Sequence, residues 1–294
     1  MPKPALRALT PLLVAAAICL GSAGKSSAGG ANDVLFGFST AKVVPLLIDR
    51  KITEMHALIA QTPRHPGDDD YRKILEAATL AANQDYERAV VIFDQTRGLP
   101  QAPSQIQILA AKSYGNLIQY PKAIAYATMA IKQAHEPDAY RLRAGCYMAQ
   151  NHFVAAASDY EAMAALEPGA APSHIAKAAK ALVDANKAQE GLNLIDKYMA
   201  SKGSRSAVML GTCRALCLER LGRNQEAAEV ISRELDNVNK KKDLGVFERC
   251  SYLTSILEER AKCYDKLGQK SKAAADREQV KKLTRDTFEE TTGK

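Results

Sequence analysis

Apolar and small residues recur along most of this chain at the spacing of one helix face, and short polar stretches interrupt them. Ala144 is followed three residues later by Tyr147, and Ala156 four residues later by Tyr160, so each pair lies on one side of a helix. The polar residues Gln-Asn-His at 150–152 separate the two pairs. This stretch therefore predicts a helix, a tight turn and a second helix.

The same unit recurs through the sequence. An anchor in its second helix returns after steps of 34, 33, 35, 36 and 46 residues, and an alanine stands twelve positions before each anchor. Small side chains at both places let two helix backbones pack closely, and stacked pairs bury apolar faces that one pair cannot bury alone. These packing positions are Ala77, Ala111, Ala144, Ala179, Ala215 and Ala261 in the first helices, and Ala89, Ala123, Ala156, Gly191, Ala227 and Ala273 in the second.

These columns resemble the tetratricopeptide repeat, whose pattern of about 34 residues runs aromatic, Leu-Gly, Tyr, Ala, aromatic and Pro. The third copy fits best and ends at Pro168, although Arg143 and Ala144 replace its Leu-Gly pair. The fourth copy, with Gly191 in place of Ala, fits worst. The resemblance covers about residues 70–288. It implies an all-α, right-handed superhelical solenoid of antiparallel helix pairs, with about six repeats plus a degenerate N-terminal pair.

The chain divides into four predicted segments. In the degenerate pair, Met55 lies 34 residues before Ala89, and Pro45 shortens or kinks the first helix. Three aspartates at 68–70 favour a helix N-terminus over a metal site. The segments are a signal peptide (1–28), a linker with the degenerate helix pair (29–66), the solenoid (67–288) and a C-terminal tail (289–294).

The first segment has the layout of a secretory signal. Lys3 and Arg7 precede an apolar run over 8–20, and small residues before Ala23 and Ala28 mark cleavage points. The run is too short to span a bilayer comfortably. We therefore expect an exported protein, periplasmic or extracellular. The alternative is an uncleaved anchor, which would give the protein its only membrane contact.

The step of 46 residues marks an insertion between the fifth and sixth copies. Both sides of a break near Lys242 have helical character. We expect the two adjoining helices to be lengthened by about six residues each and to project as a hairpin with the lysines at 240–242 near its tip. The alternative is a basic loop.

Composition changes this picture little. The net charge of +7 is spread among interleaved acids and bases, so it does not by itself indicate nucleic acid. Cys146, Cys217 and Cys263 occupy one column of small residues and read as core thiols. Cys213 and Cys217, one helical turn apart, suit neither a disulfide nor a zinc site.

No motif for catalysis, a metal or a cofactor stands out. The five histidines form no His-Glu-x-x-His pattern and accompany no nucleophile signature. We expect a non-enzymatic protein that has no metal, cofactor, small-molecule substrate or nucleic-acid partner.

The family resemblance implies a binding groove, because in tetratricopeptide proteins the first helices of successive repeats line a concave surface that holds partner segments. The corresponding set is net basic, which favours acidic or extended segments of other proteins. The leading hypothesis is a scaffold or adaptor of the bacterial cell envelope. The alternatives are an accessory subunit of an envelope enzyme or of a secretion or pilus machine and, less favoured, a nucleic-acid-binding repeat protein. The groove residues would be Lys112, Asn116, Arg141, Lys177, Lys180, Asp184, Thr212, Glu219 and Arg220.

Overall fold

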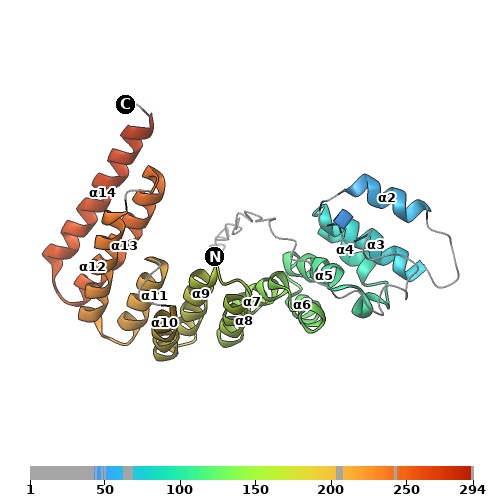
Figure 1. Cartoon of the computed structure of the whole chain (residues 1–294), viewed down its shortest axis with the longest axis horizontal. Helices are drawn as coiled ribbons and strands as arrows, with labels where there is room; N and C mark the ends of the chain where they lie inside the picture. The colour runs from blue at the N-terminus through green and yellow to red at the C-terminus, as the bar shows by residue number, and fades with distance from the viewer. Residues whose placement is uncertain are drawn as a thin grey trace, which may run out of the picture. The chain divides into compact units, whose positions relative to one another are not determined.

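The computed structural model describes residues 51–61, 69–202, 208–241 and 244–292, together with a few positions between 43 and 49. The predicted signal peptide lies outside the described residues. Within the described part of the chain the secondary structure is helical, with no strand (Figure 1). The elements are α2 (Ile52–Gln61), α3 (Asp69–Ala82), α4 (Tyr86–Phe93), η1 (Leu99–Gln101), α5 (Ser104–Asn116), α6 (Tyr120–Ala134), α7 (Pro137–Ala149), α8 (Phe153–Leu166), α9 (Ala171–Asp184), α10 (Ala188–Lys202), α11 (Val208–Arg220), α12 (Asn224–Lys240), α13 (Val246–Lys266) and α14 (Lys270–Thr292).

These helices form the all-α solenoid that the repeat predicts. From α3 to α14 they pair as first and second helices, and each second helix also contacts the first helix of the next pair. The sequence explains the tight pairing, because the packing columns at both helices are buried. Ala144 and Ala156 of the third pair have no exposed surface, and the alanines at the equivalent positions are at most 2% exposed.

The exception in these columns has a steric cause. Gly191 stands on α10 where the other second helices carry alanine. A Cβ placed there would lie 3.0 Å from the carbonyl oxygen of Ala179 and 3.2 Å from the sulfur of Cys217. Glycine therefore lets α10 approach α9 and α11 more closely than an alanine would.

The insertion before the sixth copy does not extend the two helices that flank it equally, and our expectation was wrong here. α12 has 17 residues, whereas α13 has 21 and α14 has 23. The extra length of α13 is matched by α14, which lies beside it as its antiparallel partner in the last pair (Figure 1). Lys240 ends α12 and is exposed.

The last helix, α14, has partly buried apolar residues on one side and exposed charged residues on another. Val280 and Leu283 of α14 pack against the core that α9 to α13 build, while Lys281, Lys282 and Arg285 are exposed. α14 thus closes the stack with a solvated face. In the described part of the chain, no helix has both the length and the apolar character needed to cross a bilayer.

Candidate partner-binding surface

Most first helices of neighbouring pairs lie against one another, whereas α7 and α9 make at most a slight direct contact. α5 contacts α7, α9 contacts α11, and α11 contacts α13. The exposed side chains of α5, α7, α9 and α11 are called the first-helix surface below. The nine predicted groove residues all lie on these four helices.

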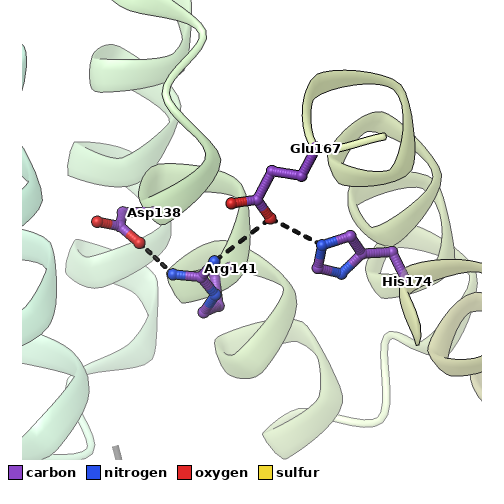
Figure 2. Close-up of polar contacts among 4 residues, drawn as sticks. All are labelled: Asp138, Arg141, Glu167 and His174. Carbon is purple, nitrogen blue, oxygen red and sulfur yellow. Dashed lines mark hydrogen bonds and ion pairs between the residues drawn. The ribbon is translucent and has the colours of Figure 1, made fainter. Parts of the chain in front are cut away.

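A polar cluster joins α7 to the start of α9 (Figure 2). Glu167, which follows α8, points its carboxylate between Arg141 of α7 and His174 of α9. Its Oε2 atom lies 3.5 Å from Arg141 Nη2 and 2.7 Å from His174 Nε2. Arg141 also forms an ion pair with Asp138 one turn earlier. Arg141 is therefore held in place and partly neutralised before any partner arrives.

His174 is the buried member of this cluster. It is 4% exposed, and its Nε2 atom carries the proton that it donates to the Glu167 carboxylate. Its buried Nδ1 atom has no hydrogen-bond partner among the described residues. His174 therefore fixes the turn between α8 and α9 rather than facing solvent.

Lys177 and Lys180 continue the surface along α9. They lie three residues apart, so they share one face of the helix, and both are exposed. Neither ammonium forms a hydrogen bond or ion pair with any residue that the structure describes. Burial raises the pKa of the Cys213 thiol on α11, and the Lys180 ammonium nearby opposes that rise. The two lysines are therefore exposed cations, without an ion-pair partner among the described residues, on the helix that packs against α11.

The other predicted residues differ in their availability. Asn116 donates to the carbonyl of Lys112 (2.8 Å), and Thr212 donates to the carbonyl of Met209 (3.0 Å). The side chain of Glu219 is largely buried and accepts a hydrogen bond from Lys266 of α13 (2.5 Å). Asp184 and Arg220 make no polar contact with the described residues. The first-helix surface thus combines residues that hydrogen-bond within the protein with residues whose polar groups are available to a partner.

The structure adds a notch that the sequence did not indicate. It has a volume of about 320 Å³ and lies between the starts of α9 and α11 and the projecting first half of α13. Its lining combines the apolar side chains of Pro172, Met209, Leu244 and Tyr252 with the charged side chains of Lys241 and Glu248. Met209 is 45% exposed.

One of these residues could have been found from spacing alone. Met209 lies three residues before Thr212 and therefore on the same face of α11. Leu244 and Tyr252 could not, because their position depends on how far α13 extends. Among the described residues, no group of three or more His, Cys, Asp or Glu side chains is arranged to hold a metal ion.

Solved structures of similar fold cover most of this chain. The apo form of RapI matches with a TM-score of 0.57 at 13% identity, over 84% of this chain and 75% of RapI. The C-terminal part of a TPR repeat-containing protein from Cytophaga hutchinsonii matches with a TM-score of 0.58 at 14% identity, over 83% and 94%. No family model and no curated protein matches the chain. These likenesses show the fold, a helical-repeat solenoid of the tetratricopeptide kind.

Proposed function

We propose that this protein is an exported, non-enzymatic scaffold of a bacterial cell envelope that binds a partner protein on its first-helix surface. The observation that carries the proposal is the pair Lys177 and Lys180, two exposed cations without an ion-pair partner among the described residues, at the contact of α9 with α11. Such a pair attracts an acidic segment, since no acid among the described residues has to be displaced.

The repeat architecture supports the same proposal. Stacked first helices present side chains in register over several pairs, which suits an extended segment better than a small molecule. The neighbouring Arg141 is already paired with Asp138 and Glu167. We therefore assign most of the recognition of acidic groups to α9.

Export is the second part of the proposal, and it rests on the signal-like residues 1–28. The chain should be expressed with a C-terminal tag in a bacterium, the cells fractionated, and the mature N-terminus read by mass spectrometry. We expect a periplasmic species that begins at Gly24 or Gly29. A cytoplasmic species that retains Met1 would contradict export.

Partner binding is tested by photo-crosslinking in the same cells. A photoreactive amino acid replaces Lys180 on the first-helix surface or, as the control, Lys197, an exposed lysine of the second helix α10. We expect a discrete crosslinked protein from position 180 and none from position 197. Equal crosslinking at both positions, or none at 180, would contradict the proposed surface.

A further inference from the structure

The notch arises from a feature that is peculiar to the sixth pair. α13 begins fifteen residues before its packing alanine Ala261, whereas α11 begins only seven residues before Ala215. The first half of α13 therefore projects about eight residues, or about 12 Å, past the start of α11. Tyr252 and Glu248 on this projecting half line the same hollow as Met209.

The walls of the notch are held in place. Arg249 of α13 donates a hydrogen bond to the carbonyl of Lys241, so the end of α12 is fixed against α13. Met209 supplies a flexible thioether that adapts to the shape of an apolar guest. The notch is thus an open recess whose lining is partly apolar and partly charged.

The notch is continuous with the two lysines. Ser173 of α9 lines the notch, and Lys177 and Lys180 follow it by four and seven residues, on the same face of the helix. These steps correspond to about 6 Å and about 10 Å along the helix axis. An extended chain covers about 3.3 Å per residue, so these distances take about two and three residues of a bound segment.

We propose that the notch binds one large apolar side chain, such as leucine, of a protein segment whose acidic residues two and three positions away lie over Lys177 and Lys180. Charge complementarity selects this occupant, because Lys177 and Lys180 extend from the notch along α9 and a third exposed lysine, Lys241, lines the notch itself, whereas Glu248 is the one carboxylate of its lining. The proposal rests on the function proposed above and deepens it. It turns a general preference for acidic segments into a motif with defined spacing.

The test uses the whole exported chain and acetylated, fluorescently labelled synthetic peptides in Gly/Ser flanks, followed by fluorescence anisotropy at low ionic strength. The probe peptides carry Leu-Gly-Glu-Glu or its reverse, Glu-Glu-Gly-Leu. The comparison peptides replace Leu by Gly, or separate Leu from the acids by six glycines. We expect the better of the two probes to bind about tenfold or more tightly than its Gly counterpart and its long-spacer counterpart.

Protein variants locate the two halves of the site. Met209→Glu should abolish the advantage of leucine, while Val154→Glu, on an equally exposed residue of α8 that lines a different hollow, should leave it unchanged. Lys177→Glu with Lys180→Glu should weaken all acidic peptides by about tenfold or more. Lys132→Glu with Lys197→Glu makes the same change in net charge on second helices and should weaken them far less. Far-UV circular dichroism and thermal midpoints check that each variant is folded.

The possible failures are distinguishable. If leucine and glycine peptides bind equally but remain sensitive to the α9 charge reversal, the notch is not an anchor site and the proposed function stands. If the long-spacer peptide binds as tightly as the better probe, the spacing is wrong. If no acidic peptide binds the unmodified protein, this surface does not recognise acidic segments, and both proposals are overturned for it.

Discussion

The guanidinium of Arg143 on α7 donates two hydrogen bonds, in a bidentate arrangement, to the carboxylate of Asp159 on α8, with N–O distances of 3.0 and 2.7 Å. The third nitrogen of the guanidinium, Nη1, donates to the hydroxyl of Thr128 (3.0 Å). Thr128 lies on α6, which belongs to the preceding helix pair. Both ends of the ion pair are largely shielded from water. Arg143 therefore ties its own helix pair together and joins that pair to its neighbour.

The sixth pair repeats this arrangement. Arg260 contacts Asp276 at 2.9 and 2.7 Å and donates to the hydroxyl of Ser232 on α12 at 3.1 Å. The recurrence identifies the contact as a structural device of the repeat. Its loss should destabilise the fold without altering the first-helix surface.

Asp159→Ala is expected to lower the free energy of unfolding by about 3 kcal/mol, because the Arg143 guanidinium would keep its buried position without a carboxylate. The double variant Arg143→Met with Asp159→Leu should recover much of that loss, since it removes both charges and retains apolar volume. Urea unfolding followed by circular dichroism measures both. Glu278→Ala is the control, because it breaks an exposed pair with Lys281 and should change stability little. Equal losses for Asp159→Ala and Glu278→Ala would contradict the assignment.

These pairs also show what the sequence could predict. The alanine columns predict the solenoid because every copy must bring two backbones together at the same two places. The carboxylate that pairs with the arginine, one position before the packing alanine of a first helix, does not recur in every copy. In the fifth copy, Arg214 is the equivalent arginine, but Val230 occupies the position equivalent to Asp159. Arg214 pairs instead with Asp196 of the preceding helix (2.7 Å). The partner of each arginine therefore follows from the three-dimensional packing.

The same distinction applies to the candidate site. Lys177 and Lys180 could be placed on the first-helix surface because helical spacing fixes the face of a residue. Predicting the notch beside them would require the length of α13 relative to α11. The sequence does not define this length, because helix-forming residues stand on both sides of the insertion. The polar cluster around Glu167 was also missed. Its members come from α7, α9 and the turn between α8 and α9, and no local spacing relates them.

Ile118 is expected to be a source of strain. Each of the six turns between first and second helices holds one residue with positive φ, and this residue is Gly, Asn or Gln in five of them. Ile118 has φ +62°, although a β-branched residue is disfavoured there, and its side chain is 71% exposed. Ile118→Asn should therefore raise the free energy of unfolding by about 1 kcal/mol, as measured by urea titration. The reciprocal change Asn186→Ile should lower it by a similar amount. Loss of stability in Ile118→Asn would show that the side chain makes a contact that outweighs the strain.

Two glycines should respond oppositely to alanine. A Cβ at Gly211 on α11 would overlap the side chain of the buried Glu234 on α12, so Gly211→Ala should destabilise the protein by about 1–3 kcal/mol. A Cβ at Gly145 on α7 would meet no atom within 4 Å, and Gly145→Ala should stabilise it by about 0.5–1 kcal/mol through helix propensity. Thermal and urea unfolding of both variants measure the difference. The same sign in both would contradict the packing described for α11 and α12.

Asp94 should make part of the stability depend on pH. Burial acts to raise its pKa, but hydrogen bonds from Lys122 (2.6 Å) and Tyr114 (2.8 Å) lower the pKa below its usual value. The unfolded carboxyl therefore takes up a proton first. The contribution of Asp94 is complete above the unfolded pKa, close to 4, and is lost as the pH falls through the lower folded pKa. Urea midpoints of the wild type and Asp94→Asn should differ at pH 6 and converge on acidification. A difference that is independent of pH would contradict this assignment.

The thiols of Cys217 and Cys263 should be inert in the folded protein. Both lie in the core as the small-residue column predicts, and burial is the main cause that raises the pKa of Cys217 to about 12 and that of Cys263 to about 11. Because the thiolate is the reactive form, almost none is present at pH 8. Iodoacetamide at pH 8, followed by peptide mass spectrometry, should leave both residues unmodified in the native protein and label them fully in urea. Rapid native labelling of Cys217 would show that α11 opens from α10 and α12, which the close approach of Gly191 to its sulfur argues against.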